Sequence, residues 1–350
     1  MGGTVPHRRP LGIVTLSQMK LRRVVSVLAL GVTALLVGMV LPAGAQSTSP
    51  AYAGDFPDPF VLVVNGTYWA YATGSAGLNL QVMSSPDLHT WTAPADPLPV
   101  LPSWASAGST WAPGVLERGT TFVMYYAVHD TALAKQCISV ATSSTPGGPF
   151  VDSSTAPLVC QTNGSIDPYP FTDPHSGRTY LIWKSDDNSV GEITHLWASQ
   201  LSSSGLSLTG ATALLLTEDA STWQAPTIEG PAMMVPAGGS TYYLFFSGGA
   251  WNTAGAGIGY ATCGAPSTLG GLHWTCRDQS TGAPWLGTRV ADRTTVFSGP
   301  SGPTVFTDTT GKLRIGYHAW TGTTVGYDNG GVRSLWINSL GFSAGKPVIP

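Results

Sequence analysis

The sequence predicts an all-β protein, a five-bladed β-propeller with four-stranded antiparallel blades around a central channel. Its 350 residues include 43 Gly, 27 Pro, 12 Trp and 12 Tyr, and only 10% are charged. This mixture favours short strands joined by tight turns, and no segment has the periodicity of a long amphipathic helix. One strand plan returns five times, at intervals of about 50 to 70 residues. Such repeats indicate propeller blades, whereas a β-sandwich does not predict five similar meanders.

Each repeat has a lead-in that contains proline, a first strand, a turn with glycine, an aromatic second strand and a third strand. In the first repeat, Asn65-Gly66 separates the β-rich runs 61–64 and 67–72, which is a strong hairpin signal. The turn glycines are Gly66, Gly119, Gly177, Gly239 and Gly311. Second strands are expected at 68–72, 122–126, 180–183, 242–246 and 313–317, and third strands at 80–83, 137–141, 195–198, 257–261 and 334–338. Residues 85–91 and 146–150 are expected to turn into fourth, outer strands.

Residues 1–45 have the pattern of a secretory signal peptide, which we exclude from the fold. Five basic residues precede an uncharged, mostly apolar run at 24–41, and Ala43-Gly44-Ala45 offers a cleavage site before Gln46. A membrane anchor is the alternative, because the run is close to the spanning minimum of about 17 residues. Pro42 and the cleavage site favour export, and Met19 is an alternative start. We therefore expect a secreted, extracellular protein with a linker at 46–53 and one propeller domain at 54–350.

The charge and the cysteines of the exported part limit its partners. Removing residues 1–45 removes five of the 16 Lys and Arg residues and none of the 19 Asp and Glu residues, which leaves a formal net charge of −8. An acidic surface without a basic patch argues against nucleic acid and membranes as partners and favours neutral substrates. An even number of cysteines in an exported protein indicates disulfides. Of the three connectivities, we favour the local pairs Cys137–Cys160 and Cys263–Cys276.

Three acidic residues lie at the starts of first strands. Asp58 precedes a proline in the first repeat, Asp167 does so in the third, and Glu229 precedes Gly230-Pro231 in the fourth. Innermost strands run along the channel, so equivalent positions surround one mouth of it. Glycoside hydrolysis needs such a group: one carboxylate activates water, a second carboxyl protonates the leaving oxygen, and a third charge raises the pKa of that acid. A calcium-binding or structural cluster is the alternative, although calcium loops place their acids two residues apart.

Together these segments resemble the motifs of glycoside hydrolase family 43, over residues 55–340. In the family's order they are Phe56-Pro57-Asp58-Pro59, Trp111-Ala112-Pro113, Ser165-Ile166-Asp167-Pro168, Ile228-Glu229-Gly230-Pro231, Ser298-Gly299-Pro300 and Tyr317-His318-Ala319-Trp320. The resemblance implies an inverting enzyme on a five-bladed propeller that acts on arabinose- and xylose-containing polysaccharides. By position it makes Asp58 the general base, Glu229 the general acid and Asp167 the modulator of that acid's pKa.

The resemblance also suggests further site residues. His318 matches a channel histidine that in many members helps to hold a calcium ion through water, and a hydrogen-bonded core histidine is the alternative. We expect no required cofactor, and a calcium ion in the channel would have a structural role. Trp111 resembles an aromatic residue of the pocket wall against which a sugar ring rests. Packing between blades is the alternative role for Trp111. Phe60 is a second candidate substrate contact. The chain departs from the family pattern at Gly114 and at 298–303, so the substrate of other family members does not transfer directly to this chain.

We therefore expect a monomeric, secreted α-L-arabinofuranosidase acting on plant arabinan or arabinoxylan. β-Xylosidase and endo-arabinanase activities are alternatives, and the loops at 92–109 and 250–257 are expected to decide between them. Five-bladed fructan and sucrose hydrolases carry Asn-Asp-Pro-Asn, Arg-Asp-Pro and Glu-Cys, where this chain has Phe-Pro-Asp-Pro, Ile-Asp-Pro and Glu-Gly. A sugar-binding propeller without turnover is the non-enzyme alternative, against which the presence of all three acids argues.

Overall fold

The computed structural model describes residues 1–2, 46–268, 271–291 and 294–350. The predicted leader therefore lies outside the described residues, apart from Met1 and Gly2. From residue 46 onward the described chain folds almost wholly into β-strands, joined by turns and two short 3-10 helices. No helix in the described part of the chain is long and apolar enough to cross a membrane.

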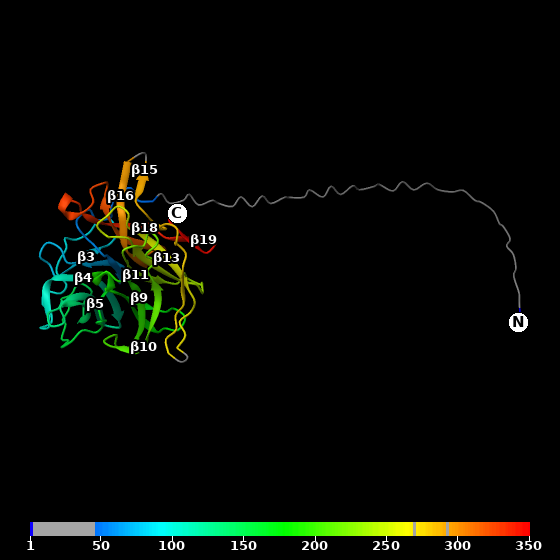
Figure 1. Ribbon diagram of the computed structural model, residues 1–350, viewed down its shortest axis with the longest axis horizontal. Helices are drawn as coiled ribbons and strands as arrows, with labels where there is room; N and C mark the ends of the chain where they lie inside the picture. The colour runs from blue at the N-terminus through cyan, green and yellow to red at the C-terminus, as the bar shows by residue number, and fades with distance from the viewer. Residues whose placement is uncertain (3–45, 269–270, 292–293) are drawn as a thin grey trace, which may run out of the picture. The chain divides into compact units, whose positions relative to one another are not determined.

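Five antiparallel sheets follow one another in chain order (Figure 1). The first contains β1 (Phe60–Val64), β2 (Thr67–Thr73) and β3 (Leu80–Ser85), and the second contains β4 (Ala105–Arg118), β5 (Thr121–Asp130) and β6 (Lys135–Ser143). The third contains β7 (Ser165–Thr172), β8 (Thr179–Ser185), β9 (His195–Leu201) and β10 (Leu208–Thr217), with η1 (Asp187–Val190) between β8 and β9. The fourth contains β11 (Ile228–Met234), β12 (Tyr242–Gly248), β13 (Gly257–Cys263) and β14 (Cys276–Asp278). The fifth contains β15 (Arg289–Ala291), β16 (Thr294–Thr307), β17 (Leu313–Thr321) and β18 (Arg333–Ser339), with η2 (Tyr327–Asn329) between β17 and β18. A separate hairpin of β19 (Gly341–Ser343) and β20 (Lys346–Val348) follows.

The innermost strands β1, β4, β7, β11 and β16 form a closed ring. Each contacts the innermost strand of the next sheet, and β16 contacts β1. This is the five-bladed β-propeller that the repeats predicted, and the turn glycines and the second and third strands lie where the sequence placed them. In the first blade, Asn65 and Gly66 both have positive φ angles, of 48° and 80°. A two-residue hairpin turn that matches the strand twist requires this conformation.

The outer edges of the first two blades differ from the predicted four strands. Their outer position is held by isolated bridges, such as Val82 with Ala95 and Ile138 with Val159, and not by a full strand. Residues 92–104 contain four prolines. Proline has no backbone N–H to donate to a ladder, so this segment cannot pair continuously.

The N-terminal segment supplies the outer edge of the fifth blade. Ala51 N–H donates to the carbonyl of Leu335 in β18 at 2.8 Å, and Leu335 N–H donates to the carbonyl of Tyr52 at 3.0 Å. The sequence assigned residues 46–53 to a linker, and this pairing corrects that assignment. Because the first residues of the domain pair with its last blade, they close the ring of blades.

Aromatic side chains fill the space between the blades. Tyr71, Tyr126, Trp183 and Trp336 are all less than 2% exposed. Trp183 of the third blade, for example, lies in one buried cluster with Val123 and Tyr125 of the second blade.

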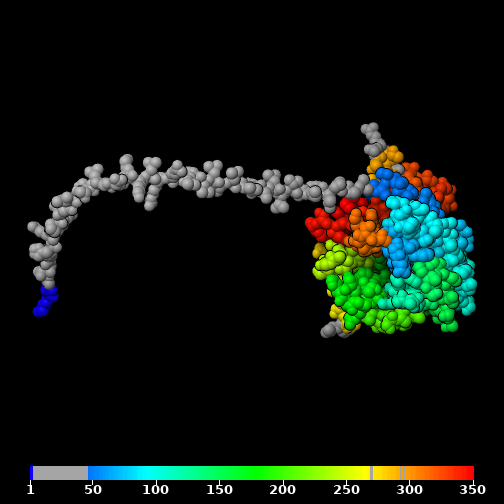
Figure 2. Space-filling view, turned by 180° about the vertical axis from the view of Figure 1, so that it is seen from behind, coloured from blue at the N-terminus to red at the C-terminus, as the bar shows by residue number. Residues whose placement is uncertain are grey.

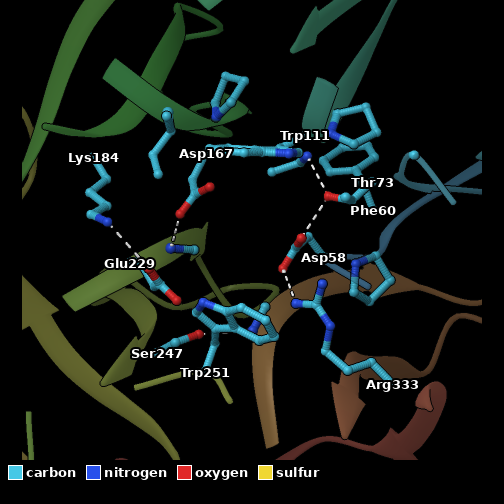
Figure 3. Close-up of a pocket in the computed structure, with 18 of the residues that line it drawn as sticks. Asp58, Phe60, Thr73, Trp111, Asp167, Lys184, Glu229, Ser247, Trp251 and Arg333 are labelled. Carbon is cyan, nitrogen blue, oxygen red and sulfur yellow. Dashed lines mark hydrogen bonds and ion pairs between the residues drawn. The ribbon is translucent and has the colours of Figure 1, made fainter. Parts of the chain in front are cut away.

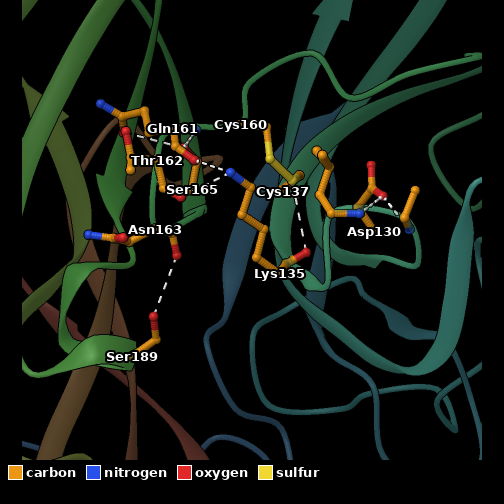
Figure 4. Close-up of a disulfide and its surroundings, with 11 residues drawn as sticks. Asp130, Lys135, Cys137, Cys160, Gln161, Thr162, Asn163, Ser165 and Ser189 are labelled. Carbon is orange, nitrogen blue, oxygen red and sulfur yellow. Dashed lines mark hydrogen bonds between the residues drawn. A yellow bond between two sulfur atoms is a disulfide. The ribbon is translucent and has the colours of Figure 1, made fainter.

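Both disulfides have the local pairing that the sequence favoured, Cys137 with Cys160 and Cys263 with Cys276. The first joins β6 to the segment that leads into β7 (Figure 4). Beside it, Lys135 Nζ donates to the carbonyl oxygens of residues 161 and 162 at 2.8 and 3.0 Å. The disulfide and this lysine therefore fix the chain just before Asp167.

A chain that begins at Gly54 instead of Gln46 tests the ring closure. It loses the hydrogen bonds between residues 51–52 and Leu335 and the edge-on contact of Tyr52 with Phe56. At about 1 kcal/mol for each of the three hydrogen bonds and about 2 kcal/mol for the buried aromatic surface, we expect the free energy of unfolding to fall by about 5 kcal/mol. Urea denaturation of both chains measures the difference. Identical midpoints would contradict the assignment of residues 46–53 to the fifth blade.

Candidate active site

In every blade the chain bends in or just before the innermost strand at a residue that precedes a proline, and the fifth blade has a second such residue at Gly299 (φ 55°). These residues have left-handed backbone conformations: Asp58 (φ 53°), Ala112 (φ 46°), Asp167 (φ 55°), Gly230 (φ 56°) and Gly302 (φ 61°). In β4, β7, β11 and β16 the pairing with the next strand shifts register at this point. The left-handed conformation costs about 1 kcal/mol or more for a residue that carries a Cβ. Its recurrence at the same end of five strands marks this mouth of the channel as the site.

Asp58 and Asp167 occupy this bent position, but Glu229 lies one residue before it. The sequence analysis placed all three acids at equivalent positions, so the structure corrects the position of Glu229. Steric crowding at the bent position explains this difference. A Cβ at Gly230 would lie 3.3 Å from the Cα of Gly302 and 3.3 Å from the Oγ of Ser247. The longer glutamate side chain reaches the same cavity from the preceding residue.

All three carboxyl groups line one cavity with a volume of about 870 Å³. Figure 3 shows Asp58 on one side of this cavity and Asp167 with Glu229 on the other. In the space-filling view of Figure 2, a hollow lies where the blue, cyan, green and orange segments meet. Cavities of about 300–1,000 Å³ are typical of small-ligand sites. The three acids therefore converge as predicted, on a space large enough for a sugar unit.

Asp58 is held as an ionised carboxylate. Its Oδ2 accepts a hydrogen bond from the Thr73 hydroxyl at 2.6 Å, and its Oδ1 lies 3.7 Å from Nη1 of Arg333. Burial raises the pKa of Asp58, but the charge of Arg333, the neighbouring His318 and the Thr73 hydrogen bond outweigh it and bring the pKa below its usual value. The side chain is 28% exposed. It can therefore accept a proton from a water molecule in the cavity.

Asp167 and Glu229 form a pair beside one buried cation. Asp167 Oδ2 accepts the N–H of Gly230 at 2.9 Å, and Lys184 Nζ donates to Glu229 Oε2 at 3.2 Å. Burial, and after it the charge of Glu229, raises the pKa of Asp167 to about 8, although Lys184 opposes this. Burial lowers the pKa of Lys184, but the charges of Glu229, Asp167 and Asp186 raise it overall, so the amine stays charged. At neutral pH the coupled pair of carboxyl groups thus holds a proton.

Aromatic side chains form the walls of the cavity. Trp111 lines it as predicted, whereas Phe60 is only 8% exposed and packs edge-on against Tyr169, with ring centroids 5.4 Å apart. Phe60 is thus mainly a core residue at the base of the cavity. Trp251 and Tyr327 line the cavity from loops of the fourth and fifth blades. The loop at 250–257 therefore reaches the site, but the loop at 92–109 supplies none of its lining residues.

His318 lies behind Asp58 and is 1% exposed. Its Nδ1 accepts the N–H of Asp58 at 2.9 Å, so the ring proton is on Nε2, which has no partner among the described residues. Burial, and after it the charge of Arg333, lowers the pKa of His318 to about 3, so the ring is neutral. An Nε2–H donates to water but cannot bind a cation directly. Within the described residues no three His, Cys, Asp or Glu side chains form a metal-binding group, and the predicted water-mediated calcium stays a prediction.

The sequence analysis missed the two wall aromatics and the three residues that contact the acids, Thr73, Lys184 and Arg333. Thr73 ends β2, Lys184 lies near the end of β8, and Arg333 begins β18. Lys184 carried a usable signal, because it directly follows the apolar run 180–183 and a charge in a buried strand requires a partner. Thr73 and Arg333 stand at strand ends, where polar residues are ordinary.

A five-bladed propeller with three carboxyl groups around one mouth of its channel defines the class, because these are the fold and the acids of a propeller glycoside hydrolase. The sequence model of glycosyl hydrolases family 43 matches residues 47–347, and the chain belongs to that family. The resemblance that the motifs indicated is therefore confirmed.

Two relatives and one solved structure illustrate the similarity. The chain is 29% identical to the beta-D-galactofuranosidase xynD of Aspergillus niger over 244 residues, which cover 63% of this chain and 65% of that protein, just under two thirds of its length. It is 27% identical to the probable arabinan endo-1,5-alpha-L-arabinosidase A of Aspergillus flavus over 304 residues, which cover 81% of this chain and 87% of that protein. A crystal structure of a thermostable family-43 glycoside hydrolase is 25% identical, with a TM-score of 0.70, and the match covers 84% of this chain and 92% of that one.

Thr73→Val removes a hydroxyl without changing the size of the side chain. That hydroxyl donates to Asp58 and accepts the N–H of Ala112 at 2.9 Å. Because the variant leaves a buried N–H without a partner, we expect the free energy of unfolding to fall by about 1–3 kcal/mol, and the pKa of Asp58 to rise. Chemical denaturation measures the loss, with Thr73→Ser, which keeps the hydroxyl, as the matched control. Equal losses in both variants would show that the hydroxyl is not the cause.

Proposed function

We propose that this protein is a secreted, inverting glycosidase that removes terminal α-L-arabinofuranosyl residues from arabinan- or arabinoxylan-type plant polysaccharides. The observation that carries the proposal is the convergence of Asp58, Asp167 and Glu229 on one cavity. Their surroundings separate their protonation states, because Arg333 lies beside Asp58 while the coupled pair of Asp167 and Glu229 holds a proton. Carboxyl groups with separated pKa values supply the base and the acid of a hydrolytic reaction.

In the proposed reaction, Asp58 accepts a proton from a water molecule as that water attacks the anomeric carbon. The bond from this carbon to the glycosidic oxygen breaks, and the departing oxygen takes a proton from Glu229. Lys184 binds one carboxyl oxygen of Glu229 and leaves the other free to face the substrate, while Asp167 keeps the pair supplied with a proton. Attack by water inverts the anomeric configuration. The carboxyl groups of Asp58 and Glu229 are then expected to stand about 6.5–9.5 Å apart.

The relatives support a furanoside substrate. One is a beta-D-galactofuranosidase and another is a probable arabinan arabinosidase. Arabinan is built of arabinofuranose, and β-D-galactofuranose has the ring configuration of α-L-arabinofuranose with one added hydroxymethyl group. A cavity that accepts this five-membered ring is the feature that the two activities share, and we assign it to this chain.

Endo-acting cleavage of arabinan is the second candidate. It is favoured by the relatives described as probable arabinan endo-1,5-alpha-L-arabinosidases, which match 81% of this chain. Linear arabinan separates the two, because an exo-acting enzyme releases arabinose alone and an endo-acting enzyme releases oligosaccharides. Nitrophenyl β-xyloside, assayed beside nitrophenyl α-L-arabinofuranoside, tests the xylosidase activity in the same experiment.

Asp58→Asn and Glu229→Gln test the proposed roles. We expect each to lower kcat/KM on arabino-oligosaccharides by about 10²–10⁴-fold without changing thermal unfolding. Nitrophenolate leaves without protonation, so Glu229→Gln should recover most of its activity on nitrophenyl arabinofuranoside, whereas Asp58→Asn should not. Glu117→Gln is the matched control, because Glu117 lines a separate cavity at the far ends of the innermost strands.

NMR detection of the first-formed anomer completes this test. An inverted product supports direct attack by water, and a retained product would refute it. If the wild-type protein turns over none of these substrates but binds arabino-oligosaccharides, the sugar-binding alternative replaces the enzymatic one.

We also propose that residues 1–45 are removed during export. The motif Ala43-Gly44-Ala45 supports cleavage after Ala45. Sequencing the N-terminus of protein recovered from the culture medium should give Gln46 as the first residue. Recovery of the protein only in the cell fraction would contradict the proposal.

A further inference from the structure

Arg333 lies over two neighbouring aromatic rings in the wall of the cavity. Its guanidinium carbon is 4.7 Å from the ring centre of Trp251 and 5.3 Å from that of Tyr327. Its Nε donates to the Tyr327 hydroxyl at 2.8 Å, and its Nη1 lies 3.7 Å from Oδ1 of Asp58. Figure 3 shows the guanidinium beside Asp58 and near the indole of Trp251. The two cation–π contacts and the hydrogen bond together restrain the guanidinium.

The two rings are exposed, yet each is fixed by the same buried residue. Trp251 is 38% exposed and Tyr327 is 43% exposed, whereas Trp320 is completely buried. Trp320 stacks on Trp251 with ring centroids 6.3 Å apart and donates its indole N–H to the carbonyl of Trp251 at 3.0 Å. It also meets Tyr327 edge-on at 5.1 Å. The exposed rings are therefore held in place from beneath.

Arg333 has a second carboxylate within reach. Asp55 accepts the backbone N–H of Arg333 at 3.2 Å, and it accepts the Tyr327 hydroxyl at 3.1 Å and the Ser75 hydroxyl at 2.9 Å. The tyrosine hydroxyl thus stands between the Arg333 side chain and Asp55. Arginine is a long side chain with many rotamers, and an unrestrained guanidinium would divide its time between Asp55, Asp58 and solvent.

We propose that Trp251 and Tyr327 are positioning residues for Asp58, because they hold the Arg333 guanidinium at the place from which it faces that carboxylate. This inference rests on the proposed role of Asp58 as the base. It assigns the loops that follow β12 and β17 a part in setting the charge of that base, in addition to their place in the wall of the cavity.

Arg333 is the permanent cation among the described groups that face Asp58. From β17, His318 presents a neutral ring, and from β2, Thr73 presents a hydroxyl. From β7, Asp167 adds a carboxyl group whose pKa Asp58 helps to raise. The lowered pKa of Asp58 therefore depends chiefly on where Arg333 lies. An opposite charge at this range typically lowers a carboxyl pKa by about 1–3 units.

Carbon-13 NMR titration of protein labelled at the aspartate carboxyl carbons tests the proposal without a substrate. Asp58→Asn assigns the Asp58 signal. In Trp251→Leu and in Tyr327→Phe, we expect the titration midpoint of Asp58 to rise by about one pH unit. The acid limb of kcat/KM should move by the same amount. Trp111→Leu is the matched control, because this wall residue makes no contact with Arg333; it should raise KM and leave the limb in place.

Arg333→Met separates positioning from a general structural effect. If the rings act through the guanidinium, Trp251→Leu should cause no further shift in the Arg333→Met background. Unchanged midpoints in both single variants would overturn the proposal, and so would a full further shift in the double variant. If the midpoints move as expected but the wild-type protein has no glycosidase activity, the positioning holds and the proposed function fails.

Discussion

A left-handed residue before a proline, present in every blade, is the backbone constraint on which the site depends. The five bends lie at the same end of the innermost strands, so a side chain at or beside a bend faces one mouth of the channel. Space decides which bends can carry an acid. A Cβ at Gly302 would lie 2.9 Å from Nδ1 of His318 and 3.1 Å from the Cα of Asp58. The fifth blade therefore has no room for a carboxylate there, and the fourth sets its acid one residue earlier.

Two buried cations then determine the charges of the acids that remain. Arg333 pairs with Asp58, and Lys184 pairs with Glu229. Three carboxyl groups in one cavity repel one another when ionised, so the coupled pair of Asp167 and Glu229, which shares the cation Lys184, holds a proton. Because the two groups titrate together, this proton belongs to the pair and is available for donation by Glu229, as proposed. The sequence analysis had assigned Asp167 as the modulator of that acid.

The sequence predicted the blades well because their signals are local and repeated. A turn glycine and an aromatic strand recur in every blade, and one strand places the next by hairpin geometry. Closure by the first residues was not predictable in this way, since Tyr52 pairs with Leu335 at the other end of the chain.

The acids of the site were predictable as a group, but their exact positions and partners were not. The sequence analysis treated Glu229 as equivalent to Asp58 and Asp167, because the sequence does not show which residue of β11 lies at the register shift. Arg333 escaped notice for a related reason. Its role comes from Trp251 and Tyr327, which reach it from separate loops, and no local pattern joins these three residues.

The pairing of chain ends that closes the ring also brings Arg333 next to Asp58, the proposed base. The segment that follows Tyr52 runs through Asp55 to Asp58, and the strand on which it pairs begins at Arg333. Phe56 N–H donates to the carbonyl of Arg333 at 2.9 Å. Because Asp58 follows two residues after Phe56, this backbone pairing brings Asp58 close to Arg333. Asp167, Glu229 and Lys184, in contrast, lie on the third and fourth blades, which are neighbours in sequence. An opened ring would therefore keep the proton-holding pair and lose the cation that keeps Asp58 ionised.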